Sequence, residues 1–312
     1  TGIILLTSGE LAITKTLTID GPGASTLSIS GNLASRVINN SAALTLNGVT
    51  IRDGSLAGID VGGGIRNSGA LTFTNSIITG SVATQGGGIY SDSGILRITN
   101  STISGNRADV GDGGGIFSGG TTQLTLTNST ISTNTAEQNA GGIFASGIAS
   151  LINSTLSGNS TKNAGGGLVT SGTVTLNNVT LTNNSALKFG GGIRQLGGSV
   201  TVKNSIIAGN PVPAASPDCT ASSSIASGGY NVLGNNFGCV FSATTGDQVG
   251  TNASPLNPLL GALQNNGGLT FTHAPGLGSP AIDAGNPAGC TDNLNVPLTA
   301  DQRGFARPSG PR

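Results

Sequence analysis

The chain has 312 residues with 13 Lys+Arg and 13 Asp+Glu, so its net charge is zero and only 8% of it is charged. Such a composition offers no basic surface for nucleic acid, and no nucleic-acid partner is expected. No run approaches 18 apolar residues, which predicts no transmembrane segment, and 36% hydrophobic residues argue against disorder.

Residues 1–40 are predicted to form the N-terminal coils of a repetitive β-structure. The chain starts without an initiator Met, and Thr1 to Leu5 already have the pattern of a strand. It also lacks the charged n-region and apolar core of a signal peptide. This start predicts a mature or fragmentary extracellular protein.

Residues 41–210 contain two sequence elements that share a period of roughly 25 residues. The first is a Gly-Gly-Gly-Ile-like element at 62–65, 86–89, 113–116, 140–143, 165–168 and 190–193. The second is an Asn-Ser/Val element that begins at Asn75, Asn100, Asn128, Asn153, Asn178 and Asn204. Two markers with one period indicate a repeat architecture for the whole range.

Within each period, apolar and polar residues alternate, as in Leu124-Thr-Leu126-Thr. Three short apolar runs per period are separated by turns rich in Gly, Asn and Ser. Good helix formers are scarce and no helical apolar stripe is present. The pattern predicts an all-β parallel solenoid of three sheets, with about 25 residues in each coil.

The recurring asparagines are expected to form a ladder inside this solenoid. An amide side chain both donates and accepts hydrogen bonds, so equivalent residues in successive coils can bond along the axis. We assign this structural ladder to Asn75, Asn100, Asn128, Asn153, Asn178 and Asn204. The glycine triplets are predicted at corners where φ is positive and two backbones approach closely.

Residues 211–312 are predicted to hold the C-terminal coils, an excursion at 211–238 that breaks the period, and an irregular tail. Cys219 and Cys239 bracket this excursion, and a disulfide between them would stabilise it by roughly 3 kcal/mol. Disulfides are typical of oxidising compartments, so this pair indicates secretion. Cys290 remains, either free or bonded to a partner outside the chain.

The N-S-T-I-S-G-N-x-A…G-G-G-I repeats resemble those of secreted bacterial β-helix proteins and of polymorphic outer-membrane passengers. Residues 4–23 resemble the stretch after the CSLREA segment of such proteins. Residues 257–261, 264–268, 278–285 and 301–304, with Thr272-His273, resemble the choice-of-anchor Q domain. The resemblance implies a right-handed, single-stranded parallel β-helix displayed at a bacterial surface. In that family a further Cys follows beyond Arg312, which implies that the partner of Cys290 lies outside this chain.

Candidate sites are few. Asp92, Asp109 and Asp112 form a weak candidate for a Ca²⁺ site, against the usual interpretation as solvated loop charges. His273, the only histidine, is interpreted as a structural hydrogen-bonding residue, since no nucleophile elbow is present. The two glutamates, Glu10 and Glu137, lie several coils apart, so they do not form an acid–base pair. No cofactor and no enzymatic activity are expected.

The sequence therefore favours a non-enzymatic extracellular β-helix that acts as a stalk, adhesin or matrix-fibre subunit. Its expected partners are further copies of itself, other cell-surface or matrix components, or polysaccharide. The alternative is a polysaccharide-binding or polysaccharide-cleaving β-helix that is similar to pectate lyases. In that alternative, Arg52, Arg66, Arg97 and Arg194 would line a groove on one face.

Overall fold

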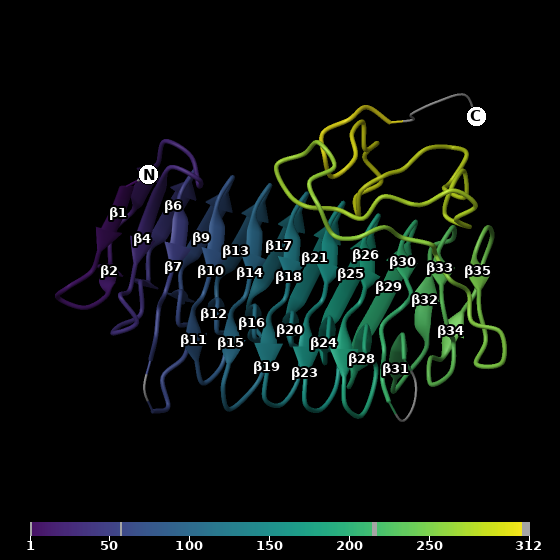
Figure 1. The fold of residues 1–312 in the computed structure, drawn as a ribbon, viewed down its shortest axis with the longest axis horizontal. Coiled ribbons are helices and arrows are strands. Elements are labelled where there is room, and N and C mark those ends of the chain that lie inside the picture. Colours follow the sequence, from purple (N-terminus) through teal and green to yellow (C-terminus); the bar gives the residue numbers. More distant parts are fainter. Residues whose placement is uncertain (1, 57, 214–216, 308–312) are drawn as a thin grey trace.

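The computed structural model describes residues 2–56, 58–213 and 217–307, and these form short strands and no helix. Every ladder between named strands is parallel, and successive turns of the chain stack along one axis (Figure 1). The all-β solenoid with about 25 residues per turn is confirmed. None of the described residues forms a helix that could span a membrane.

Four sheets run along the axis. Sheet A has eleven strands, β1 (Gly2–Leu5), β4 (Leu27–Ser30), β7 (Thr50–Arg52), β10 (Ile77–Thr79), β14 (Thr102–Ser104), β18 (Thr130–Ser132), β22 (Thr155–Ser157), β26 (Thr180–Thr182), β30 (Ile206–Ile207), β33 (Val232–Leu233) and β35 (Gln248–Val249). Sheet B has nine, β2 (Leu11–Ile13), β5 (Ile38–Asn40), β8 (Ile65–Asn67), β12 (Ile89–Ser91), β16 (Ile116–Ser118), β20 (Ile143–Ala145), β24 (Leu168–Thr170), β28 (Ile193–Gln195) and β31 (Cys219–Ala221).

Sheet C has ten strands, β3 (Leu17–Asp20), β6 (Ala43–Asn47), β9 (Ala70–Thr74), β13 (Ile95–Thr99), β17 (Gln123–Thr127), β21 (Ile148–Ile152), β25 (Thr173–Asn177), β29 (Ser199–Lys203), β32 (Ile225–Ser227) and β34 (Phe241–Ser242). Sheet D, which the sequence did not predict, has five strands of two residues each, β11 (Val82–Ala83), β15 (Arg107–Ala108), β19 (Thr135–Ala136), β23 (Ser160–Thr161) and β27 (Ser185–Ala186). A regular coil passes from sheet A to D, B and C. Runs of two residues are too short for periodicity to reveal a fourth sheet.

The stack of strands continues across the predicted domain boundaries at residues 40 and 210. Strand β5 ends at Asn40 and pairs with β8. The prediction of an excursion at 211–238 is wrong in part, because β31, β32 and β33 lie within this range and pair with β28, β29 and β30. Part of that excursion, 214–216, lies outside the described residues, as do Thr1, residue 57 and 308–312. The described part of the chain is therefore one solenoid followed by a C-terminal segment.

The core is a narrow column of aliphatic side chains that stack on their equivalents in the next coil. In sheet A, Ile51, Ile78, Ile103 and Ile131 occupy equivalent positions, and each is fully buried. Complete burial of such a side chain contributes about 1.5–3 kcal/mol. Phe73 is the one aromatic residue among the largest fully buried side chains of the described chain. Because each coil contributes one short strand to each sheet, the interior between the sheets is too narrow for an aromatic ring in every coil.

The glycine elements follow sheet D at the corner where the chain turns into sheet B. Gly113 has a φ of 70°, which a residue with a side chain rarely adopts. A Cβ on the next residue, Gly114, would lie 2.2 Å from the backbone oxygen of Thr135 in the neighbouring coil. The triplets therefore serve both predicted purposes, a left-handed turn and the close approach of two backbones.

An asparagine ladder does run inside the solenoid, but it consists of Asn106, Asn134, Asn159, Asn184 and Asn210, each at most 1% exposed. At each step, the amide nitrogen of one residue donates to the amide oxygen of the next at 2.9–3.0 Å. That oxygen also accepts the backbone N–H of the preceding asparagine at 3.0–3.1 Å. We call this column the inner asparagine ladder.

The ladder predicted at Asn75, Asn100, Asn128, Asn153, Asn178 and Asn204 is wrong. These six residues have φ between 47° and 56° and form the turn from sheet C to sheet A. Asparagine is favoured there because its short polar side chain tolerates the left-handed region. Asn75 and Asn100 bond to each other at 3.3 Å on the exposed surface, whereas the buried Oδ1 of Asn128 has no partner among the described residues. Their recurrence therefore reflects a backbone requirement.

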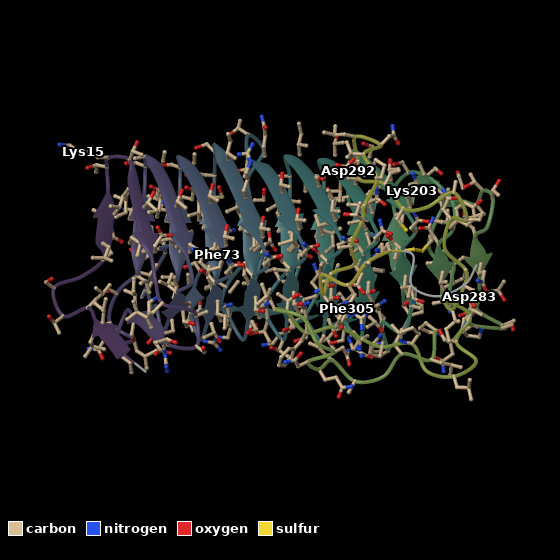
Figure 2. The ribbon with its side chains drawn as sticks, turned by 90° about the horizontal axis from the view of Figure 1, so that it is seen from above. Lys15, Phe73, Lys203, Asp283, Asp292 and Phe305 are labelled. Atoms are coloured by element: carbon tan, nitrogen blue, oxygen red, sulfur yellow. A yellow bond between two sulfur atoms is a disulfide. The ribbon has the colours of Figure 1, made fainter. Side chains whose placement is uncertain are left out.

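The C-terminal segment, residues 250–307, lies back over sheet A from β18 onward (Figure 1, yellow-green). Among the described residues, its backbone pairs only through isolated antiparallel bridges, such as the one between Gln264 and Thr272. Seen from above, its side chains, with Phe305 labelled, cover part of the rod, while the end that carries Lys15 stays clear (Figure 2). The first coils therefore present an open sheet A, and the later ones a covered one.

Candidate functional site

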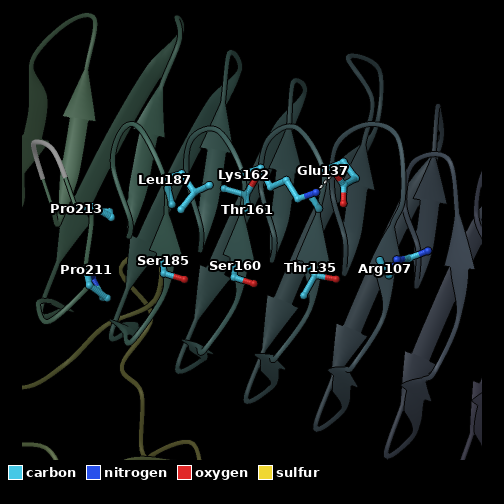
Figure 3. A pocket seen from close by; sticks show the side chains of 12 residues that line it. Arg107, Thr135, Glu137, Ser160, Thr161, Lys162, Ser185, Leu187, Pro211 and Pro213 are labelled. Atoms are coloured by element: carbon cyan, nitrogen blue, oxygen red, sulfur yellow. Dashed lines mark ion pairs between the residues drawn. The ribbon is translucent and has the colours of Figure 1, made fainter.

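An open groove of about 500 Å³ lies along sheet D, parallel to the solenoid axis (Figure 3). One side is a row of outward residues that start the short strands, namely Thr135, Ser160 and Ser185. A second row follows two residues later in each coil and comprises Glu137, Lys162 and Leu187. Figure 3 shows the two rows side by side, with Arg107 at one end and Pro211 and Pro213 at the other.

The groove is built by the register of sheet D. Thr135 pairs with Ser160, and Ser160 with Ser185, so their side chains recur at the spacing of neighbouring strands, about 4.8 Å. The residues between the rows, such as Ala136 and Ala186, point into the core and are buried. Residues two apart on a strand share a face, which leaves a channel between the rows.

The charged groups at the groove neutralise one another. Lys162 Nζ lies 2.7 Å from Glu137 Oε2, and Arg107 lies 3.7 Å from Asp109. Glu137 is the one carboxylate in the lining. Hydrolysis or elimination on a sugar needs a second acid–base group or a bound cation. The lining therefore offers a single carboxylate, and that carboxylate is held in an ion pair.

The candidate Ca²⁺ residues are not brought together. Asp92 lies 3.6 Å from Arg66, and Asp109 pairs with Arg107. Asp112 Oδ1 instead accepts both the backbone and side-chain N–H groups of Asn139 at 2.9 Å, and burial raises the pKa of Asp112. Within the described residues, no three metal-ligating side chains form a group.

The four arginines proposed to line one groove lie on three different sheets. Arg52 is in sheet A and pairs with Asp53 at 2.6 Å, whereas Arg97 points outward from sheet C. Arg66 and Arg194 are in sheet B, and Arg194 lies over the Phe189 ring at 5.3 Å. The proposal of a single arginine-lined face is therefore wrong, because each coil distributes its outward residues around the axis.

His273 attaches the C-terminal segment to the solenoid. Its Nε2 lies 2.8 Å from Ser157 Oγ, and its Nδ1 lies 2.6 Å from the Gly261 backbone oxygen. Burial lowers the pKa of His273 and so favours the neutral ring, and the Gly261 oxygen, which can only accept, requires the proton to be on Nδ1. Ser157 is itself buried, with 3% of its surface exposed.

The same segment uses the turn asparagines as attachment points. Arg307 donates to Asn178 Oδ1 at 3.0 Å and to Asn153 Oδ1 at 3.1 Å. It also contacts the Sγ of Cys290, a free thiol, at 3.1 Å. Asn204 Oδ1 accepts the backbone N–H of Asn286 at 3.3 Å. Three of the six misassigned asparagines thus bind the C-terminal segment through their side chains, and Asn128 does so through its backbone oxygen.

The inner asparagine ladder ends on a buried carboxylate beside the disulfide. Cys219 and Cys239 are bonded, as predicted, but the stretch between them contains the regular strands β31 to β33. The preceding residue, Asp218, is 2% exposed, and its Oδ1 accepts the backbone and side-chain N–H groups of Asn210 at 3.0 and 2.9 Å. Burial raises the pKa of Asp218 to about 6. The sequence offered a signal for this column, since the second Asn of each N-S-T-I-S-G-N unit recurs with the same period.

The model of a family described as a right-handed beta helix region matches residues 2–245. The chain belongs to this family. No curated protein and no solved structure matches it. The matched range of this β-helix includes sheet D and its groove, and it ends before β35 and the C-terminal segment. The resemblance of that segment to a choice-of-anchor domain stays a prediction.

Proposed function

We propose that this β-helix is a non-enzymatic extracellular protein that works as a stalk, adhesin or matrix-fibre subunit. The observation that carries this proposal is the composition of the groove beside sheet D, whose single lining carboxylate is neutralised by Lys162. The coils around it repeat one pattern, and the buried amides of their inner asparagine ladder are committed to coil-to-coil hydrogen bonds. The disulfide supports an oxidising, extracellular location.

The ends of the sheets support self-association. Strand β1 pairs only with β4 among the described strands, and its Ile3, Ile4 and Leu5 side chains are 61%, 49% and 49% exposed. An edge with free backbone groups and apolar side chains accepts another strand, from a second molecule or from further chain. The zero net charge gives little long-range repulsion between molecules.

A sugar-release assay separates this proposal from the alternative of polysaccharide cleavage. The purified chain is incubated with polygalacturonate and with neutral glucans, with and without Ca²⁺, and reducing ends and unsaturated products are measured. We expect no release above the buffer blank. Release that disappears in Glu137→Gln but persists in Asp20→Asn, an exposed carboxylate far from the groove, would establish an enzyme instead.

A second candidate function, non-covalent binding of polysaccharide, is favoured by one specific observation. The hydroxyls of Thr135, Ser160 and Ser185 line the groove and have no protein partner among the described residues. They stand in one row with one hydroxyl per coil. This adhesive version of the proposal is developed next.

A further inference from the structure

We propose that the groove beside sheet D binds a neutral linear polysaccharide whose chain runs parallel to the solenoid axis. This inference deepens the proposed adhesive function and rests on it. It assigns a ligand class to Thr135, Ser160, Ser185, Glu137 and Lys162, which line the groove.

The groove and such a ligand have matching periodicities. The hydroxyl row repeats once per coil, at the inter-strand spacing of about 4.8 Å. This repeat is close to the length of one sugar residue in an extended chain. A polymer that lies along the axis therefore meets an equivalent hydroxyl at each successive sugar, whereas an extended peptide has a shorter residue repeat of about 3.3 Å.

The groove hydroxyls are free to bind, unlike those of two other hydroxyl columns of this β-helix. Ser101 and Ser129 each accept a backbone N–H from the neighbouring coil and donate to a carbonyl of their own coil. On the covered part of sheet A, the Thr130 and Thr155 hydroxyls bond to the C-terminal segment. The groove row thus offers donors and acceptors to a ligand without breaking an internal bond.

The end of the groove that carries no charge supplies an apolar surface. Leu187 is 57% exposed there, and Pro211 and Pro213 continue the two rows. Binding sites that fix a ligand combine such apolar area with a few placed polar groups. The C–H faces of a sugar ring would pack against this end while its hydroxyls bond to the row.

The charges favour a neutral polymer over an acidic one. Lys162 and Arg107 are the cations of the lining, and each has a carboxylate partner, Glu137 and Asp109 respectively. A uronic acid chain would have to displace these partners to form its own ion pairs. A neutral sugar can instead accept from Lys162 and donate to Glu137 while the pair stays intact.

Affinity electrophoresis of the full chain tests the inference. The native gels contain hydroxyethylcellulose, galactomannan, mixed-linkage β-glucan or polygalacturonate. The groove variant is Thr135→Ala/Ser160→Ala/Ser185→Ala. The matched control is Thr45→Ala/Thr72→Ala/Thr125→Ala, which removes three outward hydroxyls of sheet C, one from each of three strands. Thermal unfolding of all three proteins verifies that each variant is folded.

We expect at least one neutral polysaccharide to retard the parent and the control equally, and the groove variant to bind about tenfold more weakly. Absence of retardation by every neutral polysaccharide would overturn the inference. So would retardation by polygalacturonate alone, or equal weakening in both triple variants. If the protein forms rods in electron micrographs but no neutral polysaccharide retards it in the gel, only this inference is refuted. Release of sugars from the gel polysaccharide would refute the proposed function.

Discussion

The inner asparagine ladder makes a sharp prediction about stability, tested by Asn159→Ala. Asn159 makes four side-chain hydrogen bonds within the core, all between 2.9 and 3.1 Å. Its Oδ1 accepts the backbone and side-chain N–H groups of Asn134, and its Nδ2 donates to the Ile131 backbone oxygen and to Asn184 Oδ1. No water can replace these bonds easily, because Asn159 is completely buried.

The magnitude follows from the groups that lose their partners. Asn134 Nδ2 keeps a bond to the Ile103 backbone oxygen, and Asn184 Oδ1 keeps the backbone N–H of residue 159. The Asn134 backbone N–H loses its partner, whereas the Ile131 oxygen keeps the Ser157 N–H of the parallel ladder. One unsatisfied buried group costs about 1–3 kcal/mol, so the free energy of unfolding should decrease by about 2 kcal/mol.

The matched control is Asn128→Gly. Asn128 has the same side chain but makes no side-chain hydrogen bond among the described residues, and its φ of 50° suits glycine. Its change in unfolding free energy should stay below about 1 kcal/mol. Urea unfolding followed by circular dichroism measures both variants. If Asn159→Ala unfolds like the parent, or if Asn128→Gly is the more destabilised, the inner ladder does not stabilise the solenoid as described.

Three further predictions concern the C-terminal third. Burial raises the folded-state pKa of Asp218 to about 6, so its contribution to stability is fully present below the unfolded pKa of about 3.9 and is lost as the pH rises through 6. Relative to the parent, the unfolding free energy of Asp218→Asn should therefore increase by about 3 kcal/mol between pH 4 and pH 8. Parallel curves of stability against pH for the two proteins would contradict this. Gln302→Ala removes bonds to the hydroxyls of sheet A, so hydrogen exchange should accelerate in the C-terminal segment and not in the solenoid; unchanged exchange there would show that this contact is dispensable. Reduction of the Cys219–Cys239 bond should lower the free energy of unfolding by roughly 3 kcal/mol. Non-reducing peptide mapping should find Cys290 bonded to neither of these cysteines, and a disulfide between Cys290 and either of them would refute this prediction.

The solenoid could be predicted because each coil repeats the same physical solution. Stacked apolar residues such as Ile103 and Ile131 recur with the period of the backbone, so the sequence shows the core directly. The position of a recurring polar residue is less certain. Asn128 and Asn134 share one period, yet the first occupies a left-handed turn and the second the core. Periodicity shows that a position repeats, and only the local backbone decides whether its side chain points inward.

The groove and the C-terminal segment could not be predicted in the same way. Sheet D arises from strands of two residues, such as β19 and β23, which are too short to show alternation. The segment has no period, and its contacts join residues far apart in sequence, as between His273 and Ser157 or Gln302 and Thr155. Such contacts depend on the path of one irregular chain, which no local pattern of residues specifies.

Electron microscopy of the purified chain over a range of concentrations tests the central claim most directly, when it is combined with the sugar-release assay on the same sample. The account predicts narrow rods that associate end to end as the concentration rises, and no release of sugars. Strictly monomeric particles at high concentration that also release reducing or unsaturated sugars from acidic polysaccharides would contradict it.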